Sequence, residues 1–123
     1  ILLSKLKIFK KELSKRKKIA EIYDDFFDMK KIKRLKVNNN KKSVYSVYPI
    51  FIKNRKDCIK KLNKNKIPFK IYYPMPMNQQ KAYKKYSTSI QKVANKISKQ
   101  ILCIPIHPYL SKNDINRIFK IFN

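Results

Sequence analysis

The segment Ile71–Tyr83 carries two prolines two residues apart, where a β-rich run gives way to polar residues. Each proline holds φ at about −65° and lacks a backbone N–H, and each disfavours helical geometry in the residue before it. The backbone from Tyr73 to Met77 is therefore predicted to be extended and stiff. Tyrosine and amide side chains on such a turn are held in place before a ligand arrives, so we expect the turn to form one wall of a binding site.

The length and composition of the chain favour one folded domain. A chain of 123 residues, 43% of them hydrophobic, is sufficient for a single core, and this composition excludes a disordered tail. The longest apolar runs, such as Ile101–Ile106, are far shorter than the roughly 20 residues that cross a bilayer, so no membrane-spanning segment is expected. The chain opens on an apolar helical pattern without a methionine, which is typical of an internal part of a longer protein.

The first half of the chain predicts a long helix, a loop and a strand. Apolar residues at three- and four-residue spacing from Leu2 predict an amphipathic helix that ends near Asp28. At 1.5 Å per residue it would be about 40 Å long, so part of its apolar stripe should face something outside this domain. Residues 30–42 are polar and aperiodic and predict a loop. A β-rich run follows over residues 43–52, and Pro49 places this strand at a sheet edge or at a bulge because it cannot donate a hydrogen bond.

The second half alternates helical and β-rich patterns. In order, we predict a helix over Asp57–Leu62, a strand over Ile67–Tyr73, short helices over Gln79–Tyr86 and Ile90–Ile101, a strand over Leu102–Ile106, and a closing helix after a capping box at Ser111–Asp114. This order predicts an α+β fold in which helices pack on a three-stranded, mainly antiparallel sheet. Residues 1–123 then form one small domain, with the long helix at 1–28 and the α+β core at 43–123.

The helix before Ile67 must end without glycine, because the chain contains none. Either Asn65 or Lys66 has to adopt the left-handed conformation that commonly closes a helix. Asparagine tolerates this conformation better than lysine, so Asn65 is the predicted position.

The formal charge is +25, which often indicates nucleic acid or an anionic membrane surface as a partner. Only four of the 32 basic residues are arginine, whereas readers of phosphate and base edges favour the arginine fork. The lysines occur in every segment, and most aromatic residues fall at core-facing spacing. A small basic nucleic-acid-binding domain remains an alternative, but we do not expect nucleic acid to be the partner.

Nothing in the chain has the pattern of a complete catalytic site or metal centre. Cys58, Cys103 and the single histidine, His107, do not complete a structural zinc site, so both cysteines are interpreted as buried, reduced residues of an intracellular protein. The carboxylates of residues 24, 25 and 28 should fan across the solvated face of the long helix. We therefore predict no catalytic, cofactor-binding or metal-binding residue here.

The proline-stiffened segment at residues 71–83 resembles the tyrosine-proline-x-proline turn of the DegT/DnrJ/StrS family of nucleotide-sugar aminotransferases. Three other segments resemble family segments in the same order: the long helix with Arg16, Ala20 and Tyr23, the strand and helix start around Arg55-Lys56-Asp57, and the strand Leu102–Leu110. The resemblance covers nearly the whole chain. It implies the C-terminal small domain of a fold-type-I aminotransferase.

The resemblance also implies a function for the parent protein. Such enzymes aminate a keto nucleotide-sugar in amino-sugar biosynthesis for surface polysaccharide or glycoconjugate, with glutamate as the expected donor, in a cytoplasmic homodimer. Their pyridoxal phosphate is attached to a lysine of an N-terminal large domain that lies outside these residues. This portion alone is therefore expected to be inactive and to serve by closing the active site. The double-proline turn most resembles members that act on UDP-linked acetamido sugars.

Five residues of the turn are the predicted substrate-binding residues. By β-strand alternation, Tyr72 and Tyr73 should face opposite sides, so one of them is expected in the core. The resemblance places both tyrosines and Pro74 near the sugar nucleotide. Asn78 stands where relatives often carry histidine, and Gln80 matches a glutamine of the motif, although it could instead cap the following helix.

Three further residues attract attention but have simpler interpretations. His107 follows a strand and precedes a turn, where histidine commonly satisfies backbone carbonyls. Arg16 and Arg55 are interpreted as residues that stabilise the fold or an interdomain contact.

Overall fold

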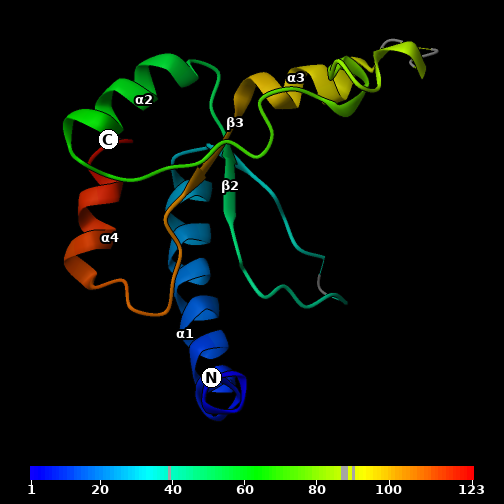
Figure 1. The fold of residues 1–123 in the computed structure, drawn as a ribbon. Helices are drawn as coiled ribbons and strands as arrows, with labels where there is room; N and C mark the ends of the chain where they lie inside the picture. Colours follow the sequence, from blue (N-terminus) through cyan, green and yellow to red (C-terminus); the bar gives the residue numbers. More distant parts are fainter. Residues whose placement is uncertain (39, 87–88, 90) are drawn as a thin grey trace.

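The computed structural model of the chain describes residues 1–38, 40–86, 89 and 91–123. Its elements are α1 (Leu2–Met29), β1 (Lys33–Arg34), β2 (Tyr48–Phe51), α2 (Arg55–Lys64), the 3₁₀ turns η1 (Met77–Gln79) and η2 (Lys84–Tyr86), α3 (Lys92–Gln100), β3 (Ile101–Ile104) and α4 (Lys112–Phe119). The described strands form an open antiparallel sheet in the order β1-β2-β3. α3 and the 3₁₀ turns extend away from the body formed by the sheet and the other helices (Figure 1). The predicted α+β class is confirmed.

The core lies between one face of the sheet and three helices. Strand residues at alternate positions of β2 and β3 point to this face, and residues of α1, α2 and α4 cover it; the fully buried large side chains are Tyr23, Phe27, Ile50, Leu62, Leu102 and Ile118. Tyr23 stands at the centre, where its ring meets Tyr48 edge-on at 5.0 Å and its hydroxyl donates to the carbonyl of Pro105 at 2.9 Å. That bond satisfies the hydroxyl of a fully buried tyrosine, as burial requires.

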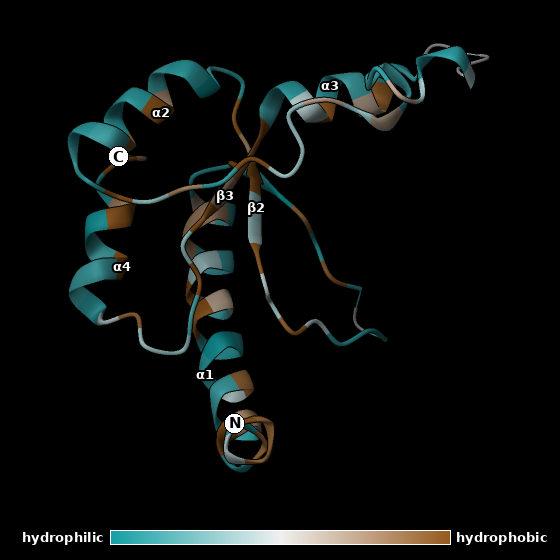
Figure 2. Ribbon diagram, viewed as in Figure 1, coloured by the Kyte–Doolittle hydropathy of each residue, from teal (hydrophilic) through white to brown (hydrophobic). Residues whose placement is uncertain are grey.

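Only the second half of α1 contributes to this core. Ala20 is 0% exposed, whereas Leu2 is 82% exposed and Leu6 and Phe9 are also exposed. Figure 2 shows hydrophobic and hydrophilic residues alternating in the first turns of α1, and the apolar ones are exposed among the described residues. The predicted long amphipathic helix is therefore confirmed. The described residues leave part of its apolar stripe uncovered, as was also expected.

The prediction that the strand of Pro49 lies at an edge or bulge is wrong, because β2 is the central strand. The missing donor of Pro49 points toward β1, where Leu35 donates to the Pro49 carbonyl at 3.3 Å but receives no bond in return. β1 consequently has only two residues, and it lies in the segment predicted to be a loop. Proline is tolerated in a central strand here because its donor-less side meets a very short partner.

The predicted strand Ile67–Tyr73 is also wrong, since it pairs with β3 only through Lys70 and Cys103. These two residues exchange both backbone hydrogen bonds, at 3.0 and 2.8 Å. In this register the next bonded pair on one side would be Pro68 with Pro105, and neither has an N–H. The proline positions therefore reduce a strand to a single bridge.

The short helix predicted over Gln79–Tyr86 is replaced by the two 3₁₀ turns. Gln80 follows η1 with extended backbone, at φ −67° and ψ 140°, so the first turn does not continue. The following helix, predicted from Ile90, is α3; it begins at Lys92, and Ile90 itself lies outside the described residues. The capping box of α4 is confirmed, with the Ser111 hydroxyl accepting from the Asp114 N–H at 3.1 Å and the Asp114 carboxylate accepting from the Ser111 N–H at 3.1 Å.

The prediction that the helix carboxylates fan into solvent is wrong for Asp24, which is half-buried, whereas Asp28 is exposed as predicted but is paired. One turn apart on α1, they meet the mostly buried guanidinium of Arg34 at 3.0 and 2.8 Å. Asp24 also accepts a hydrogen bond from the Tyr48 hydroxyl at 2.5 Å. The hydrogen bond from Arg34 lowers the pKa of the Asp28 carboxyl. This cluster fastens the start of β1 to α1.

Helix α2 ends through Lys66, at φ 54°, and not through the predicted Asn65. The Ile67 N–H then reaches back to the Leu62 carbonyl at 2.9 Å, which is the bond of a Schellman motif. The Asn65 side chain instead donates to the Lys61 carbonyl at 2.9 Å, so its amide is used as a cap. The chain therefore accepts a left-handed lysine where glycine would be less strained.

We predict that Lys66→Gly stabilises the fold. Glycine removes the cost of a left-handed side-chain-bearing residue but adds freedom to the unfolded chain, for a net gain of about 0.5–1 kcal/mol. Urea denaturation would measure this difference. The control Lys61→Gly, inside α2, should destabilise by about 1 kcal/mol. If Lys66→Gly also destabilised, the strain interpretation would be incorrect.

A second prediction concerns alkaline pH. Burial and the hydrogen bond to Asp24 raise the pKa of Tyr48 above its ordinary value near 10. Neutral Tyr48 therefore stabilises the fold below about pH 10, and this contribution is lost as the pH rises further. Tyr48→Phe should cost about 1–3 kcal/mol at pH 7, and the gap between Tyr48→Phe and the unchanged chain should narrow between pH 9 and 11.

The control for this second prediction is Tyr86→Phe, which removes an exposed hydroxyl. Its free energy of unfolding should stay parallel to that of the unchanged chain over the same pH range. A constant gap for Tyr48→Phe would contradict the proposed titration.

Candidate functional site

The tyrosine-proline turn, residues 71–80, lies on the surface. Tyr72 is 42% and Tyr73 is 71% exposed, and the peptide bond between them is cis. The expectation that one tyrosine faces the core is wrong. Phe69 and Ile71 pack against the core, and alternation would send Tyr73 after them, but the chain has left the sheet after Lys70.

The turn forms one wall of a cavity of about 560 Å³. The opposite wall is α3 and the first residue of β3, so two segments about 20 positions apart in the sequence face each other. The lining residues are Tyr72, Tyr73, Met75, Pro76, Met77 and Gln80 from the turn, and Ala94, Ile97, Ser98 and Ile101 from the other wall. We call this hollow the main cavity. Its surface is chiefly apolar, with two phenol groups, one amide and one hydroxyl, which suits a ligand with a flat or apolar part and several hydrogen-bonding groups.

The turn is ordered by its own hydrogen bonds. The N–H groups of Gln79 and Gln80 donate to the carbonyls of Pro76 and Met77, at 3.0 and 3.1 Å. The Gln79 side-chain amide then donates to the Asn95 side-chain oxygen at 2.7 Å. This last bond crosses from the turn to α3 and joins the two walls of the main cavity. The predicted stiff turn therefore has a structural basis beyond its two prolines.

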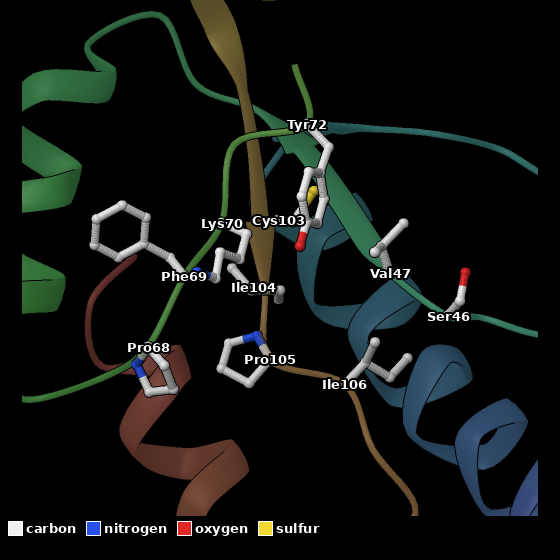
Figure 3. A pocket seen from close by; sticks show the side chains of 10 residues that line it. All are labelled: Ser46, Val47, Pro68, Phe69, Lys70, Tyr72, Cys103, Ile104, Pro105 and Ile106. Atoms are coloured by element: carbon white, nitrogen blue, oxygen red, sulfur yellow. The ribbon is translucent and has the colours of Figure 1, made fainter. Parts of the chain in front are cut away.

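Tyr72 also lines a smaller hollow of about 210 Å³. Figure 3 shows the Tyr72 ring between Cys103 of β3 and Val47 of the segment before β2. Cys103 is buried on the sheet face opposite the core, and burial raises the pKa of its thiol. Tyr72 thus belongs to the lining of both hollows.

The structure brings together three of the five predicted site residues. Tyr72, Tyr73 and Gln80 line the main cavity. Pro74 is exposed and Asn78 is half-buried in η1, and neither lines this cavity. Sequence reasoning missed the wall formed by Ala94 and Ile97, although their helical spacing was recognised, because spacing alone does not say whether an apolar face meets the core or a cavity.

His107 and Arg55 have structural contacts, as predicted, but the histidine contact differs in kind. The Nδ1 atom of the exposed His107 accepts a hydrogen bond from the Tyr109 N–H at 3.3 Å, so it satisfies an amide and not a carbonyl. Arg55 donates to two backbone carbonyls within this domain. Arg16 lies half-buried on α1, and its Nε atom is buried without a hydrogen-bond partner.

The main cavity does not have the groups that hold pyridoxal phosphate. A lysine to bond the aldehyde and a carboxylate to face the ring nitrogen are needed, and among the described residues that line this cavity there is neither. Over residues 1–38, 40–86, 89 and 91–123 no group of three or more potential metal ligands occurs. In the same described part, no helix is long and apolar enough to cross a bilayer.

The fold and the turn define a small α+β domain of the aminotransferase kind, and comparisons with known proteins agree. The model of the DegT/DnrJ/EryC1/StrS aminotransferase family matches residues 1–123. The chain therefore belongs to this family. The nucleic-acid-binding alternative gains no support from the comparisons.

The individual relatives are sugar aminotransferases. The chain is 33% identical over 118 residues to UDP-2-acetamido-2-deoxy-3-oxo-D-glucuronate aminotransferase of Pseudomonas aeruginosa, covering 96% of this chain and 33% of that protein. It is 25% identical over 123 residues to dTDP-3-amino-3,6-dideoxy-alpha-D-galactopyranose transaminase of Aneurinibacillus thermoaerophilus, covering all of this chain and 34% of that protein.

A solved relative has the same fold. The crystal structure of a DegT DnrJ EryC1 StrS aminotransferase from Brucella abortus superposes with a TM-score of 0.92 at 32% identity, over 99% of this chain and 33% of that chain. The chain thus spans about a third of the length of the relatives that it matches.

We predict that the bond between Gln79 and Asn95 contributes about 0.5 kcal/mol, because it is exposed to water. A double-mutant cycle with Gln79→Ala and Asn95→Ala, measured by urea denaturation, should give a coupling energy of that order. Asn95→Asp keeps the accepting oxygen and is the control. If Asn95→Asp destabilised as much as Asn95→Ala, the side-chain bond would not be the cause.

Proposed function

We propose that this chain is the small-domain portion of an aminotransferase that converts a keto nucleotide-sugar to an amino sugar. The observation that carries the proposal is the exposed tyrosine-proline turn, which walls the main cavity in a member of this family. The relatives from Pseudomonas aeruginosa and Aneurinibacillus thermoaerophilus, whose names specify UDP- and dTDP-linked sugars, support the substrate class.

The task of this portion is to bind and orient the substrate. The phenol groups of Tyr72 and Tyr73 and the amide of Gln80 can hydrogen-bond hydroxyl or phosphate oxygens, while the two rings offer flat apolar surface to a sugar or base. The apolar α3 wall excludes water from the opposite side. Pro74 and Asn78 lie in the same turn but do not line the main cavity. We propose that they contact a part of the nucleotide-sugar that extends beyond this cavity.

The cofactor belongs to another part of the protein in this proposal. Pyridoxal phosphate, which the family implies, supplies the chemistry of amino-group transfer. The main cavity lacks the groups that would hold it, and the proposal assigns it to residues outside these 123. The exposed first half of α1 would pack on that other part, which agrees with its uncovered apolar residues.

Three further features belong to the proposal. Glutamate is the proposed amino donor, and two copies of the parent protein are proposed to assemble as a homodimer. A cytoplasmic location is supported by Cys58 and Cys103, which are buried free thiols, as is common in reducing compartments. The product would enter amino-sugar biosynthesis for a surface polysaccharide or glycoconjugate.

The test uses the parent protein that contains this chain, with glutamate and a UDP-linked 3-oxo acetamido sugar. The protein should show the visible absorbance band of bound pyridoxal phosphate and should transfer the amino group. Tyr73→Ala should lower kcat/KM for the sugar by about tenfold or more, because it removes both a ring surface and a hydroxyl from the site.

The matched control for this experiment is Tyr86→Ala. Tyr86 is an exposed tyrosine of η2 that does not line the main cavity. Its kcat/KM should stay within about twofold of the unchanged protein, the usual size of a remote surface effect. A parent protein without cofactor absorbance or transfer activity would refute the proposed function, whereas equal effects of the two variants would refute only the role of Tyr73.

A further inference from the structure

Helix α3, one wall of the main cavity, receives little support from hydrophobic packing. Ser98 is its only buried residue among those described, while Val93 is 71% exposed and Ile97 is also exposed. Its apolar side faces the main cavity through Ala94 and Ile97. A helix of nine residues with so little buried surface is only marginally stable by itself. Its continuity with β3 and its polar contacts therefore contribute most to fixing its position.

One such contact comes from Arg55, the first residue of α2. Its Nη1 atom donates to the carbonyl of Ser98 at 2.6 Å and to the carbonyl of Ile101 at 3.0 Å. These carbonyls lie where α3 ends and β3 begins, and carbonyls at a helix C-terminus lack partners inside the helix. A single guanidinium nitrogen thus holds both sides of the junction between α3 and β3.

The position of this arginine in α2 is unfavourable for α2 itself. A cation in the first turn opposes the helix dipole, whereas a cation at a helix C-terminus is favourable. Arg55 is in the first turn of α2 and reaches the C-terminus of α3. The charge of Arg55 therefore stabilises the C-terminus of α3, the helix that walls the main cavity.

Ile101, one of the two residues that Arg55 contacts, lines the main cavity together with Tyr72 and Tyr73. In the register set by Lys70 and Cys103, the next bonded partner of Tyr72 would be Ile101. The Ile101 N–H donates to the Ile97 carbonyl, and the Ile101 carbonyl accepts from Arg55. The N–H that could continue the ladder is therefore occupied, while the carbonyl keeps a second lone pair. The tyrosine-proline turn thus leaves the sheet where α3 uses the Ile101 N–H.

We infer that Arg55 is a positioning residue for the main cavity: through Ser98 and Ile101 it fixes the α3 wall opposite Tyr72 and Tyr73. It does not line the cavity itself. The inference rests on the proposed function for its consequence, which is the affinity for the nucleotide-sugar. The claim that Arg55 fixes α3 does not depend on the proposed function, because it concerns only contacts within this domain.

The experiment compares Arg55→Ala, Arg55→Lys and Arg117→Ala in the parent protein. Arg117 is the matched control, because its Nη2 atom also donates to a backbone carbonyl, that of Asn65 at 3.0 Å, but far from α3 and outside the main cavity. Amide hydrogen exchange over residues 92–101 measures how firmly α3 and its junction with β3 are held. Steady-state kinetics with the nucleotide-sugar measure the consequence.

Arg55→Ala should speed exchange in residues 92–101 and raise KM for the nucleotide-sugar by about tenfold, with kcat within about twofold, because it loosens a wall without removing a reacting group. Arg55→Lys keeps a cationic donor and should recover part of both effects. Arg117→Ala should change neither, although it lowers stability. If Arg55→Ala does not fold, Arg55→Lys against Arg117→Ala decides the same question.

Unchanged exchange in residues 92–101 of a folded Arg55 variant would overturn the inference, whatever the activity. An equal rise in KM for the Arg55 and Arg117 variants would also overturn it, since it would indicate general destabilisation. A parent protein without transfer activity whose α3 nevertheless loosens in Arg55→Ala would refute the proposed function and leave the positioning role supported.

Discussion

The single backbone pair between Lys70 and Cys103 determines where the tyrosine-bearing segment leaves the sheet. On one side of this pair the ladder cannot continue, because Pro68 and Pro105 would meet without an N–H between them. On the other side, the N–H and carbonyl of Ile101 are bonded to Ile97 and Arg55. The chain departs from β3 after Lys70, and the tyrosines that follow are exposed.

The same pairing explains why the two faces of the sheet have different uses. Side chains of Ile50 and Leu102 point to the face that α1, α2 and α4 cover, and they are fully buried. Lys70 and Cys103 belong to the opposite face, which the helices leave open to the turn and the two hollows. The buried packing of the domain is thus concentrated on one side, while groups that line the hollows occupy the other.

Much of this arrangement could be predicted from the sequence, and the failures have identifiable causes. The 28-residue helix, the capping box of Ser111 and the stiff turn follow from local periodicity and proline geometry. The identity of the third strand, the central place of Pro49 and the left-handed Lys66 depend on pairing and tertiary contacts that local patterns do not encode. The cluster of Asp24, Asp28 and Arg34 was missed for the same reason, because Arg34 comes from a segment without periodicity. For the site, the turn was recognisable, but the α3 wall required knowledge of which face of that helix meets the core.

Helix α1 joins two environments along its length, and its substitutions should therefore have separable consequences. Near Ala20 the helix touches residues of its own domain, so a larger side chain there would clash with them and impair folding directly. Near Leu6 the helix is exposed among the described residues, and a polar replacement would leave this domain intact. The two ends of the helix are thus under different constraints: residues near Ala20 must fit the core of the folded domain, whereas residues near Leu6 are free of that packing.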